Sequence, residues 1–135
     1  SFARKNPSTA LPAGLVEERA GARFFHRHPG IPCALYALEV DEKTYRDLRE
    51  RVREMYARRE EYRYNLLGAV SCFFRLPLAR RRHYFCSEFV AEVLERSGAA
   101  ELSKPPALTR PMDLCRMRAL RPILQGRVDA LAGVA

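Results

Sequence analysis

Between residues 86 and 98, apolar and polar positions alternate with the period of a helix. The apolar positions recur at i, i+3, i+4, i+7 and i+8 and are Cys86, Phe89, Val90, Val93 and Leu94. The polar positions, expected on the opposite, solvent-facing side, are Glu88, Glu92, Glu95 and Arg96. Gly98 follows, where the end of a helix favours a residue that tolerates a positive φ. The pattern predicts an amphipathic helix with Cys86 in its first turn.

Earlier stretches of the chain predict a strand and two further helices. Cys33 to Val40 is almost continuously apolar, as in a central strand covered on both faces. Asp41 is then expected to cap a long helix. The apolar stripe that should hold this helix to the core consists of Tyr45, Leu48, Val52, Met55 and Tyr56. Tyr62 to Phe74 predicts an apolar helix buried on most sides, and Asn65 is a residue type favoured at its N-cap.

Both ends of the chain are rich in turn-forming residues. Residues 1–14 are expected to be mostly loop after a short extended start, and Leu15 to Phe25 is expected to form a helical turn. Thr109 should cap a short helix with Pro111 in its first turn. Leu120 to Leu124 predicts a last strand, placed at a sheet edge because Pro122 has no N–H to donate.

Composition limits the domain count and the partners. The 135 residues are 47% hydrophobic with a mean hydropathy of -0.32, which predicts one domain spanning 1–135. The net charge of +8 suits an anionic partner. Many basic residues lie between Arg46 and Arg63 but alternate with acidic ones, as on a solvated helix face, so nucleic acid is not expected. The longest apolar run, Leu66 to Phe74, is too short to span a bilayer, and no signal peptide is recognised, so a soluble, cytoplasmic protein is expected.

The cysteines and histidines give no metal pattern. The four cysteines are widely spaced and are Cys33, Cys72, Cys86 and Cys115. They match no Cys-x-x-Cys spacing, so we expect reduced thiols, no metal and no cofactor. His26 and His28 stand beside the Pro29-Gly30 turn without a further ligand at metal spacing. They are interpreted as exposed polar residues.

Cys86 is the candidate nucleophile. The first turn of a helix presents unpaired N–H groups and the positive end of the macrodipole, and both favour a thiolate over a thiol. The same N–H groups could hold the oxyanion that forms when a thiolate attacks an acyl carbon. The basic run Arg80 to His83 could favour the thiolate or meet an anionic substrate, although a solvated loop also accounts for it. The alternative is that Cys86 simply packs as a small apolar residue.

Four segments of the chain carry a resemblance to a known family. Tyr84-Phe85-Cys86-Ser87-Glu88-Phe89-Val90 resembles the nucleophile helix of the circularly permuted NlpC/P60 proteins, the YiiX-like branch of the papain-like thiol hydrolases. Those proteins show an aromatic residue, then Cys-Ser-Glu or Cys-Ser-Gln, then an apolar pair. Leu108 to Leu114 is similar to their Ser/Thr-Pro-x-Asp-Leu helix start, with Arg110 intervening before the proline. Ser1 to Pro7 resembles the segment after their histidine strand, and Tyr64-Asn65 resembles their Tyr-Asn pair.

The resemblance implies both a fold and a function. It implies an α+β papain-like domain with a small antiparallel sheet packed on helices, in which Cys86 hydrolyses or transfers acyl groups from amides or esters. The family's catalytic histidine would precede Ser1, so we expect an N-terminally truncated domain with little turnover by itself. Peptides, peptidoglycan peptides and lipid esters are all candidate substrates, and the oligomeric state stays open. The alternative is a catalytically silent binding module whose basic face recognises an anionic polymer or a membrane surface.

Overall fold

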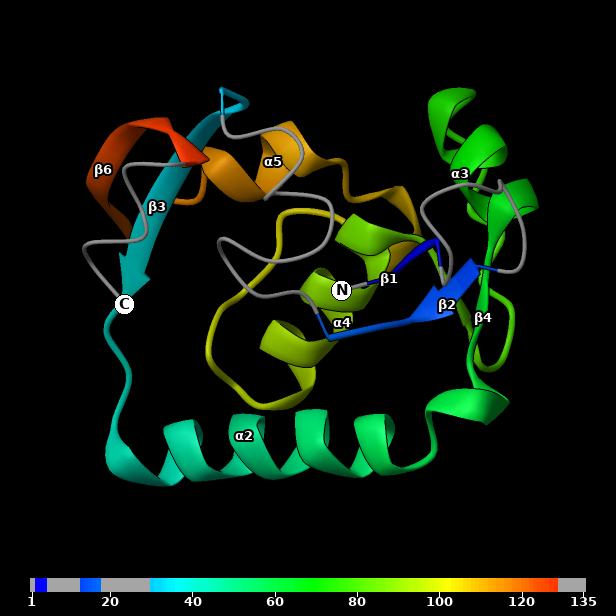
Figure 1. The fold of residues 1–135 in the computed structure, drawn as a ribbon, viewed down its shortest axis with the longest axis horizontal. Helices are drawn as coiled ribbons and strands as arrows, with labels where there is room; N and C mark the ends of the chain where they lie inside the picture. The colour runs from blue at the N-terminus through cyan, green and yellow to red at the C-terminus, as the bar shows by residue number, and fades with distance from the viewer. Residues whose placement is uncertain (1, 5–12, 18–29, 129–135) are drawn as a thin grey trace. The chain divides into compact units, whose positions relative to one another are not determined.

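The computed structural model describes residues 2–4, 13–17 and 30–128. Helices and two small sheets make up these residues (Figure 1), which confirms the predicted α+β class. The chain divides into two compact units. The larger contains residues 2–4, 13–16 and 40–117, and the smaller contains residues 17, 30–39 and 118–128. Within the described ranges, no helix is both long enough and apolar enough to cross a membrane.

The sheet of the larger unit has four short strands in the order β1-β2-β4-β5. They are β1 (Phe2–Arg4), β2 (Ala13–Leu15), β4 (Arg63–Tyr64) and β5 (His83–Tyr84). The first three are antiparallel neighbours, whereas β4 and β5 are parallel, so the sheet is mixed and not purely antiparallel. Leu15 ends a strand, so the helical turn predicted to begin there is wrong at that residue, and residues 18–25 lie outside the described ranges.

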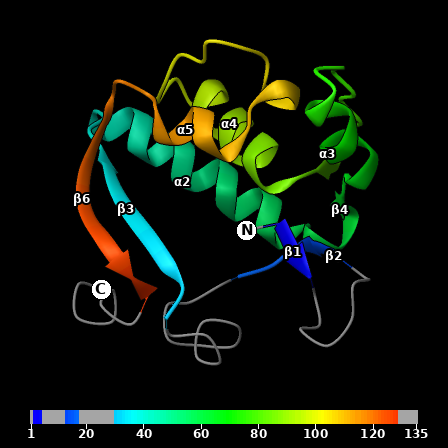
Figure 2. The same ribbon diagram turned by 90° about the horizontal axis from the view of Figure 1, so that it is seen from above.

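The larger unit also contains helices, which supply much of its core. They are α2 (Glu42–Ala57), α3 (Leu66–Phe73), α4 (Cys86–Arg96) and α5 (Pro111–Cys115), with 3₁₀ turns η1 (Arg59–Glu61) and η2 (Pro106–Leu108). Leu15 of β2 packs with Phe89 and Val93 of α4 to form the buried centre. Figures 1 and 2 both show α2 running alongside α4, and the two helices are in contact.

The long helix α2 begins as the sequence predicts. The carboxylate of Asp41 accepts a hydrogen bond from the Thr44 N–H at 2.7 Å, which satisfies one of the unpaired donors of the first turn. Three residues of the predicted apolar stripe pack against the buried centre, namely Leu48, Val52 and Met55. The other two, Tyr45 and Tyr56, lie exposed, so the stripe is narrower than predicted.

The smaller unit contains a two-stranded antiparallel ribbon (Figure 2) formed by β3 (Pro32–Leu38) and β6 (Leu120–Arg127). The pairing shifts register between Leu35 and Tyr36, where β6 contributes one extra residue beside Pro122. Among the described residues β6 pairs with β3 alone, as predicted for an edge strand. The central position predicted for β3 is wrong, because β6 is its one partner among the described residues and none of its own residues is buried. A short apolar run fits a strand but does not specify how many neighbours it has.

Arg110, the residue that departs from the family pattern, joins two helices. It occupies the N-cap of α5, where Thr109 was predicted, and its N–H donates to the Asp113 carboxylate at 2.8 Å. Its guanidinium reaches the C-terminal end of α3 and donates to the carbonyl oxygens of Cys72 and Phe73 at 3.2 and 2.9 Å. The positive charge of the guanidinium also interacts favourably with the negative end of the α3 dipole. Arg110 therefore anchors α3 to α5.

Candidate active site

Cys86 is the first residue of α4, as the sequence predicts, and its side chain is exposed. Phe85 precedes it in an extended conformation as the N-cap, and its carbonyl accepts the first hydrogen bond of the helix, from the Phe89 N–H at 3.0 Å. The backbone amides of Cys86 and the two residues after it have no carbonyl ahead of them in the helix. The sulfur therefore lies at the positive end of α4 and is accessible from outside.

Glu88 stabilises the first turn of α4 from its buried side. Only 3% of the residue is exposed, so its predicted place on the solvent side is wrong. Its Oε2 accepts hydrogen bonds from the Phe85 N–H at 3.2 Å and from Asn65 Nδ2 at 3.4 Å. Burial raises the pKa of Glu88, and these two hydrogen bonds lower it in part. The helical period placed Glu88 among the polar residues, but a carboxylate three residues after an N-cap can turn back to that cap.

Asn65 is the centre of this buried polar contact and is itself completely buried. Its Oδ1 accepts the Gly68 N–H at 2.9 Å, which confirms the predicted N-cap of α3. Its amide also donates to the Leu78 carbonyl at 3.1 Å and to Glu88. A Cβ at position 68 would collide with this side chain, so only glycine fits there. One asparagine thus links the first turns of α3 and α4.

A second contact fixes the other side of the Cys86 turn. The buried hydroxyl of Ser87 donates to the Thr109 carbonyl at 2.8 Å. Thr109 is also buried, and its own hydroxyl donates to the Pro105 carbonyl at 3.1 Å. The sequence suggested a capping role for Thr109, whereas the structure places it beneath the turn that carries the cysteine.

Tyr64 lies beside the cysteine. Burial raises the pKa of its phenol, and the charge that the neighbouring Cys86 carries when it is deprotonated raises this pKa further. A phenol held in its protonated form can donate a hydrogen bond to an anion at this position. The sequence identified the Tyr64-Asn65 pair without a role for either residue. Tyr64 pairs with Tyr84 in the parallel β4–β5 ladder, and Tyr84 lies two residues before Cys86. This pairing brings Tyr64 to the site.

No histidine in the described part of the chain is shown beside the sulfur. His83 is the one histidine within these ranges, and its Nδ1 lies 2.9 Å from the Arg81 carbonyl. His26 and His28 lie outside the described residues. In the basic run before the cysteine, Arg82 pairs with Glu61 at 2.9 Å.

The other three cysteines differ from Cys86 in their surroundings. Cys72 is buried in α3, Cys33 is partly buried in β3, and Cys115 is exposed at the last position of α5. All four are free thiols. The described residues contain no group of three or more His, Cys, Asp or Glu side chains that could hold a metal ion. Cys86 and Cys115 are thus a natural pair for comparison, because both are exposed but they stand at opposite ends of their helices.

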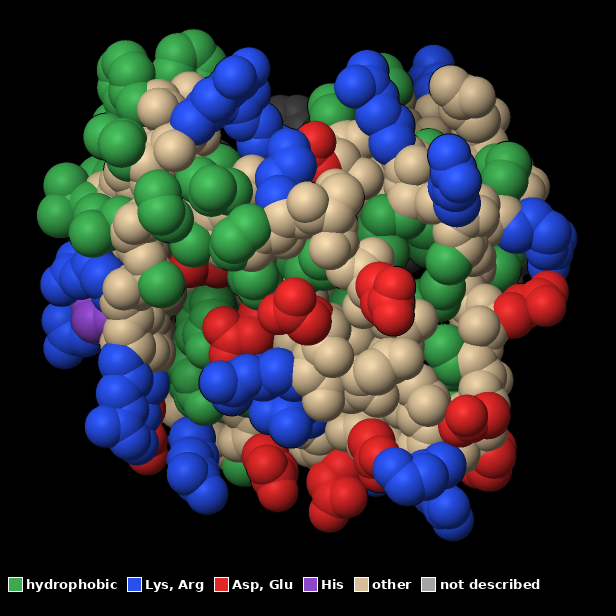
Figure 3. Space-filling view, turned by 180° about the vertical axis from the view of Figure 1, so that it is seen from behind, with side chains coloured by type: hydrophobic (Ala, Val, Ile, Leu, Met, Phe, Trp, Pro, Cys, Tyr) green, Lys and Arg blue, Asp and Glu red, His purple; other side chains and the backbone are tan. Residues whose placement is uncertain are grey.

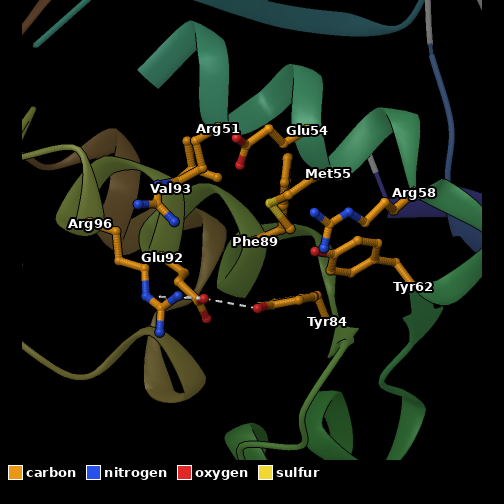
Figure 4. A pocket seen from close by; sticks show the side chains of 10 residues that line it. All are labelled: Arg51, Glu54, Met55, Arg58, Tyr62, Tyr84, Phe89, Glu92, Val93 and Arg96. Carbon is orange, nitrogen blue, oxygen red and sulfur yellow. Dashed lines mark hydrogen bonds and ion pairs between the residues drawn. The ribbon is translucent and has the colours of Figure 1, made fainter. Parts of the chain in front are cut away.

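A small pocket of about 90 Å³ lies between α2 and α4 (Figure 4). It is lined by Arg51, Glu54, Met55, Arg58, Tyr62, Tyr84, Phe89, Glu92, Val93 and Arg96. The Tyr84 hydroxyl donates to Glu92 at 2.8 Å, and Arg96 pairs with the same carboxylate at 3.4 Å. Burial, followed by the hydrogen bond to Glu92, raises the pKa of Tyr84, so the phenol remains a donor. Cys86 does not line this pocket, so the thiol must meet a substrate elsewhere.

Comparison with family models, curated proteins and solved structures finds no match to this chain. The resemblance to the permuted NlpC/P60 proteins therefore stays a prediction. Its residues nevertheless meet in the structure, because the Cys86 turn contacts Asn65 through Glu88 and the segment before α5 through Ser87.

Proposed function

We propose that this chain is a papain-like thiol hydrolase or acyltransferase of the permuted NlpC/P60 type, with Cys86 as its nucleophile. The observation that supports the proposal best is the position of Cys86, exposed at the first residue of a helix whose first turn is fixed by buried contacts. Exposure admits a substrate, and the helix N-terminus stabilises negative charge on sulfur.

The proposed reaction has two steps. In the first, the thiolate of Cys86 attacks the acyl carbon of an amide or ester, and the unpaired amides of the first turn stabilise the negative charge on the acyl oxygen. The carbon–nitrogen or carbon–oxygen bond breaks, the amine or alcohol leaves with a proton, and a thioester remains. In the second, water or another acceptor attacks the thioester and restores the thiolate. Tyr64, which lies beside the cysteine, is a candidate hydrogen-bond donor to the thiolate.

The reaction also needs a base that takes the thiol proton and returns it to the leaving group. His83 is held toward the Arg81 carbonyl, so the proposal assigns this role to a histidine outside the described residues. Within this chain, His26 and His28 are such histidines. Peptides, peptidoglycan peptides and lipid esters are the substrate classes to screen, since each contains the required acyl bond.

The first test compares two cysteines in one molecule. Iodoacetamide labelling is followed by peptide mass at a pH of about 6.5, two units below the roughly 8.5 of a free thiol. Cys86 should label about tenfold faster than Cys115, because both are exposed but Cys115 ends its helix. Equal labelling of the two would remove the support for an activated nucleophile at Cys86.

The second test follows the acyl group itself. Incubation with an activated ester should add one acyl mass to the peptide that contains Cys86, and Cys86→Ala should abolish both this adduct and acyl transfer. Cys115→Ala is the matched control and should leave both unchanged. If Cys86→Ala retains acyl transfer, the assignment is wrong. Measuring acyl transfer by His26→Ala and by His28→Ala then shows whether either histidine is the base.

A further inference from the structure

The outward face of α3 and the residues after it are strongly apolar and exposed. Phe73 is 73% exposed, Phe74 67%, Leu76 63% and both Leu66 and Leu67 60%. We define the α3 face as Leu66, Leu67, Val70, Phe73, Phe74 and Leu76. Exposed apolar side chains are common singly, but six of them within eleven consecutive residues form a patch. The sequence predicted this helix to be buried on most sides, and that prediction is wrong.

The exposure of the α3 face does not come from a loosely held helix. The opposite side of α3 is buried at Gly68 and Cys72. Asn65 caps its start from a fully buried position, and Arg110 binds the carbonyl oxygens at its end. The helix is thus fixed at both ends in an orientation that keeps the α3 face outward.

The stretch of chain that carries this face has charge of one sign. Residues 62–87 contain five arginines and no aspartate or glutamate. We call Arg75, Arg80 and Arg81 the arginine group, since all three are exposed and no ion pair joins them to a carboxylate in the described part of the chain. In Figure 3, hydrophobic side chains gather at the upper left, over the end of the larger unit that α3 forms, with Lys and Arg side chains beside them.

We propose that the α3 face and the arginine group together dock on the surface of a bilayer that contains anionic phospholipid. Leucine and phenylalanine side chains enter the boundary between headgroups and acyl chains, while arginines beside them bind the lipid phosphates. The missing acidic residues favour this occupant over a second copy of the chain, whose identical arginine group would add like charge to the contact. The proposal concerns residues other than Cys86 and does not rest on the chemistry proposed there.

Co-sedimentation with lipid vesicles tests this proposal on the 135-residue chain. One set of vesicles is pure phosphatidylcholine, and the other is phosphatidylcholine mixed with phosphatidylserine. Binding is expected to the mixed vesicles, to weaken on added salt, and to be much weaker to the pure ones. No binding to the mixed vesicles, or equal binding to both, would overturn the proposal.

Two pairs of variants test the two parts of the surface separately. The double variant Arg80→Gln with Arg81→Gln should weaken binding about 30-fold, since each arginine near an anionic surface contributes on the order of fivefold. Its control is Arg46→Gln with Arg49→Gln, which removes the same charge from exposed positions of α2. The double variant Leu67→Ser with Val70→Ser should weaken binding on the order of tenfold. Its control is Tyr45→Ser, an exposed aromatic residue on α2.

The controls decide how any loss is interpreted. If the α2 variants weaken binding as much as the α3 variants, binding depends only on net charge or general apolarity, and the α3 face is not the docking surface. Sedimentation equilibrium on the same proteins examines the rival occupant. The proposal would be overturned if the unmodified chain forms a dimer and does not bind vesicles, while the double variant Leu67→Ser with Val70→Ser is a monomer. The α3 face would then be assigned to a contact with a second copy of the chain.

Discussion

Helices α3 and α4 begin at neighbouring positions yet use their apolar residues in opposite ways. Helix α4 buries Phe89 and Val93 in the core and buries the charged residue Glu88 as well. Helix α3 is more apolar in composition but leaves Leu67 and Phe73 largely exposed. Hydrophobicity therefore does not by itself measure burial in this protein. What distinguishes the helices is the pattern, because α4 alternates polar and apolar positions whereas α3 has no polar side to turn outward.

Replacement of the asparagine that joins the two helices should have the largest effect. Asn65→Ala removes the cap of α3 and leaves the Glu88 carboxylate with one hydrogen bond fewer in a buried site. We expect the free energy of unfolding to fall by about 3 kcal/mol in urea denaturation. Asp41→Ala removes the exposed cap of α2 and should cost about 1 kcal/mol. Equal losses would show that Asn65 acts only as a local cap and does not couple the helices.

A methyl group added beside this asparagine should have the next largest effect. In Gly68→Ala the new Cβ would collide with the Asn65 side chain, which has no free space to move into because it is fully buried. The expected loss is about 2 to 3 kcal/mol. Gly126→Ala in β6, where a Cβ would meet nothing within 4 Å, should change stability by less than about 0.5 kcal/mol. A tolerated Gly68→Ala would contradict the close packing described at the start of α3.

The same truncation in each helix tests the burial difference directly. Val93→Ala in α4 should lower the free energy of unfolding by about 2 kcal/mol, because the side chain is in the buried centre. Val70→Ala in α3 should change it by less than about 0.5 kcal/mol, because the side chain is about half exposed. Thermal and urea denaturation of the two variants measure both values. A large loss in Val70→Ala would mean that other residues cover α3 in solution.

The smallest expected effect is a pH dependence that arises from Glu88. Burial raises the pKa of Glu88 in the folded protein above its ordinary value of 4.5, so the folded state binds a proton more tightly than the unfolded state does. The tighter proton binding therefore adds to the free energy of unfolding at low pH. This contribution is lost as the pH rises from about 4.5 through the pKa of Glu88 in the folded protein.

Glu88→Gln removes this titration but keeps an oxygen that can accept the hydrogen bonds from Phe85 and Asn65. The stability of the variant relative to the unmodified chain should increase between about pH 4 and pH 7, measured by urea denaturation at each pH. Glu92→Gln is not a suitable control, because the Glu92 carboxylate is partly buried and accepts a hydrogen bond from Tyr84. The control is Glu50→Gln at an exposed position of α2. A constant difference for Glu88→Gln would contradict the raised pKa.

The sequence predicted the elements better than it predicted their surroundings. The start of α4 at Cys86, the caps Asp41 and Asn65 and the positive φ of Gly98 are all local properties, and each is confirmed. They depend on neighbours within one helical turn, which the sequence displays directly.

Several of the incorrect predictions concern contacts between residues distant in the chain. Glu88 is buried because Asn65 reaches it, Thr109 lies beneath Ser87, and β3 has one partner strand in the described ranges. Helical period and strand propensity carry no information on such partners. At the site, the sequence identified Cys86 and the Tyr64-Asn65 pair. It could not place Tyr64 beside the sulfur, because that neighbourhood depends on the parallel pairing of β4 with β5.

The buried contacts of the Cys86 turn also bear on how this region folds. Asn65 lies 23 residues before its partner Glu88, and Thr109 lies 22 residues after its partner Ser87. Each contact closes a chain loop of about this length, and the entropy of both closures must be offset before the turn is held. A peptide cut from residues 83–98 would carry the whole motif and lack both restraints, so the geometry at the cysteine belongs to the folded chain and cannot be transplanted with the motif.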